Sequence, residues 1–428
     1  MRLDPFSGLY SRDPATAWRR INATATSISY DDDLEMWLIA GHDNVRTVLS
    51  DTARFSNAAT MLPITALTAD AGDILAGLDA PAVAVAADRP QHLRTRAILR
   101  ALMPTTAVRA DQQWGPLVAA RTDDLITDMK TNGPTDLMHF AVQLPLLIIH
   151  DVLGLPAAAA AQVRAWTDDF ADLVWGNPTP EAQIAHAYSS VALWRYCADI
   201  VSGRADRGDY GPGLIGELLR YRNNDDSNLT VAEVAALALN IVGAGWITTA
   251  GALGNALAHA LADPGRWALL ADDEHYLNLH VEETLRHSPA IDGWLRLTIT
   301  DVSLDGVTIP AGSRCLVLIG AANHDPSVYA EPEVFDPRRG RAGQHLAFGA
   351  GPHYCIGAAL ARLELTTALR ALARRLPDLA LAAGFRQQFK TSAALRQLTS
   401  LPVQQHPAGR CPVAHGTCAE PRSGRDTA

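Results

Sequence analysis

The stretch that decides the fold reads Phe348-Gly349-Ala350-Gly351-Pro352-His353-Tyr354-Cys355-Ile356-Gly357-Ala358-Ala359-Leu360-Ala361-Arg362. It begins as a glycine-rich loop, presents one cysteine, and continues into an alanine- and leucine-rich run that favours a helix. Gly349 and Gly351 allow backbone conformations and close approaches that a Cβ would block. Cys355 precedes the predicted helix, so we expect free backbone N–H groups to lower the pKa of its thiol and to hydrogen-bond a thiolate.

A single thiolate with space in front of it suits an iron porphyrin, which leaves the iron one position for a protein ligand and one open face. Thiolate ligation pushes electron density onto the iron and favours cleavage of the O–O bond. For a lone cysteine, the plain alternative is a buried structural residue in a strand–loop–helix turn.

The pattern F-x-x-G-x-x-x-C-x-G, continued by A-x-x-A-R-x-E as far as Glu364, resembles the haem-ligand signature of cytochromes P450. The resemblance implies a mainly α fold with smaller β-sheets, in which haem b lies between a long oxygen-binding helix and the cysteine loop. It implies that Cys355 is the axial ligand of the haem iron, and it places Phe348, Gly349 and Gly357 beside the cofactor.

A basic segment upstream, Asp88-Arg89-Pro90-Gln91-His92-Leu93-Arg94-Thr95-Arg96, is expected to grip the haem propionates. His92 and Arg96 are four residues apart and share one face of a predicted helix that Asp88 caps. Without further context, such a segment is usually a solvated helix start. It resembles the D-P-P-x-H-x-x-x-R helix of the family, with Arg89 in place of the first proline.

The resemblance also assigns a scaffold behind the cysteine. Glu283 and Arg286 form an E-x-x-R pair on one face of a predicted helix, and such a pair is normally a weak surface ion pair. In the family it is buried and bonded to a later arginine, expected here to be Arg339, so losing one partner should be severe. Arg296, in a predicted strand, and His353 are expected to be the third and fourth propionate contacts.

A second motif lies in a long apolar helix that is predicted to begin at a capping box, Thr230-Val231-Ala232-Glu233. Midway it contains Gly243-Ala244-Gly245-Trp246-Ile247-Thr248. Glycine costs about 1 kcal/mol in a helix interior, so these small residues indicate where a flat group approaches the backbone or the helix opens. Asn240, Ala244 and Thr248 recur every four residues and therefore share one face.

This stretch matches the A-G-x-[acid]-T oxygen-binding motif of the family, with Ala244, Gly245 and Thr248 in register as the catalytic residues. Ile247 stands where the family usually carries an acid that relays protons. Three explanations stay open. Water or substrate carries the protons and Ile247 merely packs, Asn240 orders such a water, or the enzyme is atypical and couples substrates without inserting oxygen.

The resemblance also predicts which segments form the substrate pocket. An irregular segment, residues 61–87, is expected over the haem, and a turn near Ala394 is expected to dip toward it. An aromatic stripe within residues 166–175, followed by a break and a second helix from Pro180, matches the mobile lid of the family, although such a stripe is more often core. The predicted pocket residues are Met61, Leu62, Ala86, Asn240, Gly243, Asp292, Gly293 and Leu395.

The bulk properties exclude several other classes. The net charge of −10 argues against a nucleic-acid partner, and the charged N-terminus is neither a signal peptide nor a membrane anchor. We therefore expect a cytoplasmic monomer with one catalytic domain at 1–403, β-richer in about 1–60 and 290–345, and a disordered tail at 404–428. The five scattered cysteines do not form a disulfide pattern, and Cys411, His415 and Cys418 fit no strong zinc spacing.

Together these features predict a cytochrome P450 that uses O₂ and electrons from a separate ferredoxin-type partner to oxidise a small natural-product intermediate. Asn240 and the missing acid favour oxidative C–C or C–N coupling of an aromatic or cyclodipeptide-like substrate over conventional hydroxylation. A peroxide-driven enzyme is a further alternative, although Thr248 is present and no arginine is near it in the sequence. A haem protein that binds or senses a ligand without turnover is the alternative of another class. Candidates for a basic patch facing the electron donor are Arg94, Arg100, Arg109, Arg338 and Arg362.

Overall fold

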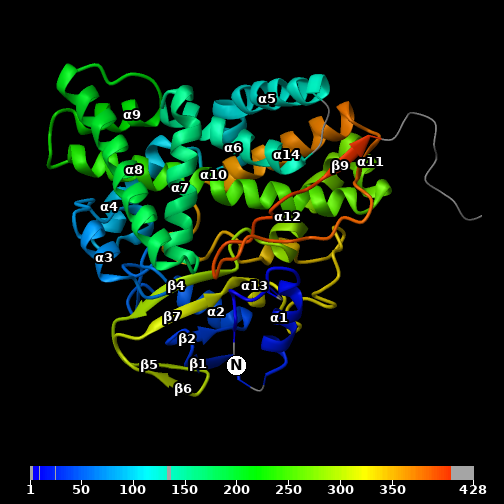
Figure 1. Cartoon of the computed structure of the whole chain (residues 1–428), viewed down its shortest axis with the longest axis horizontal. Helices are drawn as coiled ribbons and strands as arrows, with labels where there is room; N and C mark the ends of the chain where they lie inside the picture. The colour runs from blue at the N-terminus through cyan, green and yellow to red at the C-terminus, as the bar shows by residue number, and fades with distance from the viewer. Residues whose placement is uncertain (1–2, 9, 25, 133–135, 406–428) are drawn as a thin grey trace, which may run out of the picture.

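The computed structural model describes residues 3–8, 10–24, 26–132 and 136–405. Helices make up most of this part, and a smaller set of strands gathers at one end of the molecule (Figure 1). The expected mainly α fold with small β-sheets is therefore confirmed. The α-helices are α1 (Pro14–Asn22), α2 (His42–Ser50), α3 (Ala69–Ala76), α4 (Gln91–Leu102), α5 (Ala107–Asn132), α6 (Leu137–Leu153), α7 (Ala160–Trp175), α8 (Pro180–Arg207), α9 (Gly213–Arg222), α10 (Val231–Leu261), α11 (Pro264–Asp272), α12 (Glu274–His287), α13 (Ile319–Ala322) and α14 (Ala358–Arg375).

The largest sheet joins two stretches of chain that are far apart in the sequence. Its strand order is β1-β2-β7-β4-β3, with β2 and β7 parallel and the other neighbours antiparallel. The pairs β5–β6 and β8–β9 form two small antiparallel sheets. The strands are β1 (Ile28–Asp31), β2 (Met36–Ile39), β3 (Phe55–Ser56), β4 (Gly293–Thr298), β5 (Val302–Leu304), β6 (Val307–Ile309), β7 (Arg314–Leu318), β8 (Leu379–Leu381) and β9 (Val403–Gln405), and the short 3₁₀ turns are η1 (Ala84–Ala86), η2 (Ala157–Ala159), η3 (Ala342–Gln344) and η4 (Gly351–His353).

Helix α10 runs through the helical part and packs against α6, α8 and α14 (Figure 1). Its predicted capping box is formed, because the Thr230 hydroxyl accepts from the N–H of Glu233 and the Glu233 carboxylate accepts from the N–H of Thr230. The helix is apolar all round because it is buried on nearly every side. Within the described residues it is the one helix long and apolar enough to cross a membrane; its packing is that of a core helix.

Turn and break signals in the sequence fall where the elements end. Asp305 and Gly306 have φ angles of 53° and 78°, as a two-residue hairpin between β5 and β6 requires. Helix α7 ends at Trp175, and Thr179 caps α8, whose first residue is Pro180.

The predicted start of α4 is wrong in one respect. The Asp88 carboxylate does not cap the helix, which begins at Gln91 without a side-chain cap. It accepts hydrogen bonds from the Ser56 hydroxyl and from the N–H of Asn57 (2.8 Å). Asp88 therefore ties the segment before α4 to β3, a long-range contact that the local capping pattern cannot reveal.

Two further expectations concern cysteines and the tail. Within the described residues, Cys197, Cys315 and Cys355 are free thiols. Nearly all of the tail from residue 404, with Cys411, His415 and Cys418, lies outside the described residues.

Candidate active site

Cys355 lies between η4 and α14 at the end of a closed loop. Its N–H donates to the carbonyl of Phe348 (2.9 Å), which joins the two ends of the loop. The N–H groups of Gly357 and Ala358, where α14 begins, hydrogen-bond the sulfur. The helix start thus directs backbone donors at the thiol, as the sequence predicts.

The effect of these donors on the thiol differs from the prediction. Burial raises the pKa of Cys355 and outweighs the hydrogen bonds from Gly357 and Ala358 and the nearby charge of Arg96. The expectation of a lowered thiol pKa is therefore wrong for the sulfur in this environment. A buried thiol of this kind becomes a thiolate when it coordinates a metal ion.

The two loop glycines have different roles. Gly349 (φ +71°) has open space around an ideal Cβ, so its backbone conformation alone favours glycine. Gly351 (φ +69°) also lies against α2, where a Cβ would come within 2.6 Å of the Cα of Ser50. The expected close approach of the chain is therefore found at Gly351, where contact with Ser50 requires glycine, and not at Gly349.

The four predicted propionate ligands come together beside this loop. The rings of His92 in α4 and His353 in η4 stack with centroids 3.7 Å apart. Arg96, one turn beyond His92, donates to the carbonyl of Tyr354. Burial, followed by the charges of neighbours such as His92 and Arg296, lowers the pKa of His353 to about 3. Burial also lowers the pKa of His92, so the surroundings favour the neutral form of both rings.

Arg296, in β4, provides the test of whether haem fits here. Its side chain is buried, and its hydrogen bonds go to the Leu295 carbonyl (2.8 Å) and the Thr60 hydroxyl (3.5 Å). Within the described residues it forms no ion pair, and burial lowers its pKa to about 10. A buried cation is stable only with an anionic partner, and Nε of Arg96 is also buried without a hydrogen-bond partner in the described chain. These residues fit a group that brings its own carboxylates, as haem does.

Helix α10 has an open patch at its middle. Ala244 is exposed and Gly243, Gly245 and Thr248 are half-buried, whereas Trp246 and Ile247 beside them are buried. Such exposure in the middle of a core helix marks a space beside it. The Thr248 hydroxyl donates to the Ala244 carbonyl (2.8 Å). The expected shared face is therefore present, with Ala244 at its open centre.

Two α10 residues serve packing more than the open space. An ideal Cβ on Gly245 would lie 2.6 Å from Cγ1 and Cδ1 of Ile149 in α6, so this glycine lets the two helices approach. Ile247 is 5% exposed and belongs to the main apolar core. Asn240 donates its amide to the Ala236 carbonyl of its own helix (2.9 Å). No residue from 240 to 248 has a carboxylate side chain.

The predicted scaffold is assembled, and its Glu283–Arg286 pair is fully buried. Two hydrogen bonds of 2.8 Å join the Arg286 guanidinium to the Glu283 carboxylate, and the side chains of both residues are 0% exposed. Arg339 adds a third contact to Glu283 at 3.2 Å, and the N–H of Asp336 a fourth at 2.9 Å. The carboxylate is thus saturated with donors, as a buried charge requires.

The predicted pocket residues fall into two groups. Met61, Ala86 and Leu395 are half-buried, and Leu62 is exposed. Gly293 and Asp292 are buried away from open space. A Cβ on Gly293 would lie 2.7 Å from the Ala393 carbonyl. The Asp292 carboxylate faces Gly320 and Tyr10, which is in the N-terminal part of the chain. The expectation that these last two residues border the pocket is therefore not met by their side chains.

An aromatic group lies beside β4, and the sequence predicts its α7 members as part of the 166–175 stripe but not Trp294. Trp175, the last residue of α7, lies against Trp294 of β4 with ring centroids 5.9 Å apart, and Phe170 lies 6.2 Å from Trp175. Trp294 and Phe170 are half-buried, so part of each ring stays accessible. The position of Trp294 two residues before Arg296 was the available signal.

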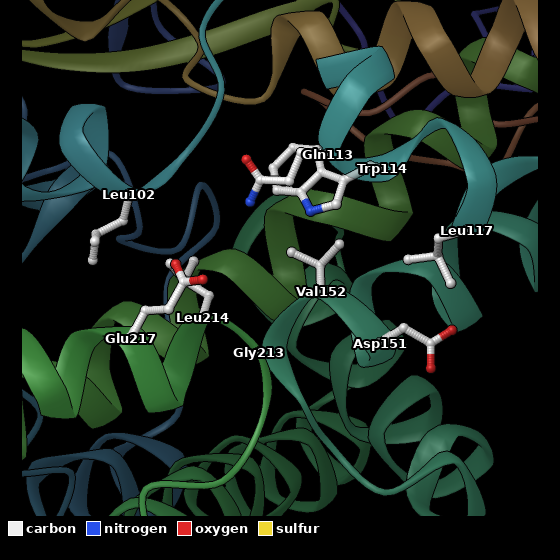
Figure 2. Close-up of a pocket in the computed structure, with 9 residues that line it drawn as sticks. All are labelled: Leu102, Gln113, Trp114, Leu117, Asp151, Val152, Gly213, Leu214 and Glu217. Carbon is white, nitrogen blue, oxygen red and sulfur yellow. The ribbon is translucent and has the colours of Figure 1, made fainter. Parts of the chain in front are cut away.

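The structure also contains a cavity of about 120 Å³ between α4, α5, α6 and α9. Figure 2 shows Trp114 and Gln113 above it and Glu217 and Val152 below. None of the predicted haem or substrate residues lines it, so it is separate from the candidate active site.

Comparisons with known proteins agree with this geometry. The cytochrome P450 family model matches residues 272–376, which include Glu283, Arg296 and Cys355. The chain is 35% identical over 382 residues to the cytochrome P450 monooxygenase PikC of Streptomyces venezuelae, covering 87% of this chain and 86% of the relative. It is 30% identical over 409 residues to the vitamin D(3) 25-hydroxylase of Pseudonocardia autotrophica, covering 94% and 96%.

Among solved structures, cytochrome P450 CREJ in complex with (4-ethylphenyl) dihydrogen phosphate superposes with a TM-score of 0.88 and 28% identity, over 94% of this chain and 99% of that chain. The fold, the cysteine loop and the near full-length relatives lead to one conclusion. The chain belongs to the cytochrome P450 family and is a haem-dependent monooxygenase with haem b as its cofactor.

Proposed function

We propose that this P450 oxidises a small natural-product intermediate by oxidative C–C or C–N coupling of an aromatic or cyclodipeptide-like substrate. The observation that carries the proposal is Ile247, which places a buried apolar side chain where an acid is usual. The aromatic group of Phe170, Trp175 and Trp294 supports a planar aromatic substrate, because offset and edge-to-face ring contacts stabilise such a ligand.

Haem bound through Cys355 supplies oxygen activation, and the chain's own residues set the conditions around it. His92, Arg96, Arg296 and His353 would hold the propionates, and the N–H groups at the start of α14 would hold the sulfur. On the α10 side, Thr248 is the hydroxyl in the open patch, and its proton is held on the Ala244 carbonyl.

Coupling and hydroxylation differ in where the oxygen atoms end. In coupling, the substrate loses two hydrogens as one C–C or C–N bond forms, and O₂ with two electrons and two protons becomes two molecules of water. In hydroxylation, one oxygen atom enters the product. Both reactions consume two protons with the two electrons, and a patch without a carboxylate leaves their delivery to water or to the substrate. We take the missing carboxylate as the mark of an atypical enzyme, in which hydrogen removal from the substrate replaces oxygen insertion.

We further propose a cytoplasmic monomer that accepts electrons from a ferredoxin-type protein. Two of the candidate basic residues are already neutralised, since Arg94 pairs with Glu233 and Arg362 with Glu282. Arg100, Arg109 and Arg338 are exposed and form no ion pair within the described residues. Arg100 lies one turn beyond Arg96, which bonds the loop of Cys355. Its replacement, Arg100→Glu, should slow reduction by a ferredoxin at low salt.

The reaction outcome can be tested with heavy-isotope O₂. Purified enzyme with a surrogate ferredoxin and reductase is given aromatic cyclodipeptides, alone and with a second aromatic nucleophile. We expect products that have lost two hydrogens and carry no heavy oxygen. Products that carry one heavy oxygen would show a hydroxylase instead.

The variant Ile247→Asp sharpens this test. Restoring a carboxylate in the open patch should increase the hydroxylated share of the products, with Ile247→Val as the matched control that keeps an apolar side chain. Equal product ratios in the two variants would show that the missing acid does not determine the reaction outcome.

A further inference from the structure

A hairpin near the C-terminal end of the described chain, residues 388–399, reaches the candidate active site. Its two arms are joined by bonds from the N–H of Lys390 to Gln397 and from the N–H of Thr399 to Gln388, both 2.8 Å. At its tip the N–H of Ala393 donates to the Trp175 carbonyl (2.8 Å), and Leu395 bridges to Ile291 before β4. The tip therefore lies between the end of α7 and the start of β4.

A buried polar cluster stands behind this tip. Asp292 (2% exposed) donates its N–H to the Ala394 carbonyl (2.7 Å), and the N–H of Arg396 (5% exposed) donates to the Ala290 carbonyl (2.9 Å). The Arg396 guanidinium lies 4.7 Å above the ring of Phe389 at the base of the hairpin. Asp292 and Arg396 thus hold the tip through backbone hydrogen bonds. Their side chains carry opposite charges and are near enough to interact electrostatically.

The third member comes from the N-terminal part of the chain. Tyr10 (7% exposed) packs edge-on against Trp18 with ring centroids 5.4 Å apart, and its hydroxyl lies close to the Asp292 carboxylate without a hydrogen bond to it. The next residue, Ser11, accepts the N–H of Phe389 through its carbonyl (2.8 Å). Burial raises the pKa of Asp292 to about 6, while Arg396 and the Tyr10 hydroxyl act in the opposite direction.

The cluster is more polar than packing alone would need. Within the described chain, Oδ1 of Asp292, Nε of Arg396 and the Tyr10 hydroxyl are all buried with no hydrogen bond of good geometry. Apolar side chains of the same size would avoid that cost. Directional polar contacts are retained where one arrangement has to be specified.

We propose that Tyr10, Asp292 and Arg396 are positioning residues that fix the tip of the 388–399 hairpin beside the substrate, so that the N-terminal segment helps to set substrate affinity. The inference rests on the proposed function, in which the substrate lies against the aromatic group of Phe170, Trp175 and Trp294, and the tip contacts that group at Trp175. It does not depend on whether the reaction is coupling or hydroxylation.

The test uses haem-loaded Tyr10→Phe enzyme, which loses a single oxygen atom, and two azole probes that bind haem iron. Imidazole is too small to extend far from the iron, whereas 4-phenylimidazole carries a ring that reaches the pocket walls. We expect the Kd of 4-phenylimidazole to rise by roughly two- to tenfold, the range expected when one buried polar group of a positioning cluster is removed. The Kd of imidazole should stay the same.

Hydrogen–deuterium exchange provides a readout that needs no turnover. In Tyr10→Phe, amides of the 388–399 hairpin and of Asp292 should exchange roughly tenfold faster, while α10 stays protected. Tyr221→Phe, at an exposed tyrosine of α9, is the matched control and should change neither readout. Arg396→Lys, which keeps the charge, should raise the Kd of 4-phenylimidazole less than Arg396→Met does.

Three results would overturn the inference. One is an unchanged hairpin exchange rate in Tyr10→Phe, and another is faster exchange spread equally over α10. The third is a faster hairpin with unchanged affinity for 4-phenylimidazole, because the tip would then not reach the ligand. None of these results bears on the product analysis, so failure of this inference and failure of the proposed coupling reaction can be told apart.

Discussion

The loop of Cys355 and the Asn240–Thr248 stretch of α10 use polar groups in opposite ways. Behind the cysteine, polar groups from distant parts of the chain converge, as when Glu283 bonds both Arg286 and Arg339. On α10, the polar side chains turn back on their own helix, and packing is made by small and apolar residues. The first region determines which cofactor binds. In the second region, a few substitutions should be enough to change the course of the reaction.

The largest effect should come from breaking the scaffold. Glu283→Ala leaves two arginines buried without their anion, so we expect a loss of about 3–5 kcal/mol of unfolding free energy and little haem-loaded protein. Thermal unfolding and haem content of the purified variant measure this. Glu274→Ala, at an exposed pair with Arg370, is the control and should behave as wild type. Full haem content in Glu283→Ala would contradict the structural role.

Acid should weaken the same region next. Burial lowers the pKa of His280 to about 4 and of His287 to about 3, from the usual value of 6.5. Below pH 6.5 the unfolded chain binds protons that the folded chain does not, so stability should fall as the pH drops from 6.5 toward 4.

Burial raises the pKa of Asp292 to about 6 and that of Glu364 well above its usual value, so these two carboxyls act in the opposite sense. Burial also lowers the pKa of His259 and His324 well below 6.5, which adds to the loss of stability in acid.

Urea unfolding across this pH range measures the slope. We expect His287→Phe to flatten the loss of stability, whereas His275→Asn, at an exposed histidine, should leave it unchanged. A stability that stays level from pH 6.5 to pH 4 would mean that these histidines are not buried in their neutral form.

On the α10 side a matched pair of glycines separates packing from helix propensity. Gly245→Ala should destabilise by about 1–3 kcal/mol because the new methyl group meets Ile149. Gly243→Ala meets only Thr167 at 3.7 Å, so it should be neutral or stabilise by up to about 1 kcal/mol. Equal effects of the two substitutions on thermal unfolding would contradict a steric role of the Gly245–Ile149 contact.

The smallest effect on stability, and a specific one on turnover, is expected at Thr248. Thr248→Ala removes one hydroxyl from the open patch, and product formed per electron consumed should fall by roughly two- to tenfold, the range one hydrogen bond contributes. Thr248→Ser keeps the hydroxyl and should retain most of the yield. Unchanged yield in the alanine variant would leave water or substrate as the sole proton carrier.

The sequence predicts those features that depend on local chemistry. The capping box at Thr230, the Asp305–Gly306 turn and the break after Trp175 all lie where short-range rules put them. The fold follows from the specific pattern around Cys355. Arg339 was identified only through resemblance, since nothing local connects it to Glu283.

The misses come from long-range contacts. Asp88 prefers donors at Ser56 and Asn57 to the helix start beside it. Burial, which a sequence window cannot measure, raises the pKa of Cys355 although helix N–H groups point at it. Tyr10 and Arg396 meet near Asp292 from opposite ends of the chain, so no motif could place them together.

The most direct test of the account is the spectrum of the reduced, CO-bound enzyme. Haem-loaded wild-type protein should give the long-wavelength Soret band of thiolate-ligated haem, and Cys355→Ser should lose that band. A wild-type protein with full haem content but without the thiolate band would contradict the assignment of Cys355 as the iron ligand.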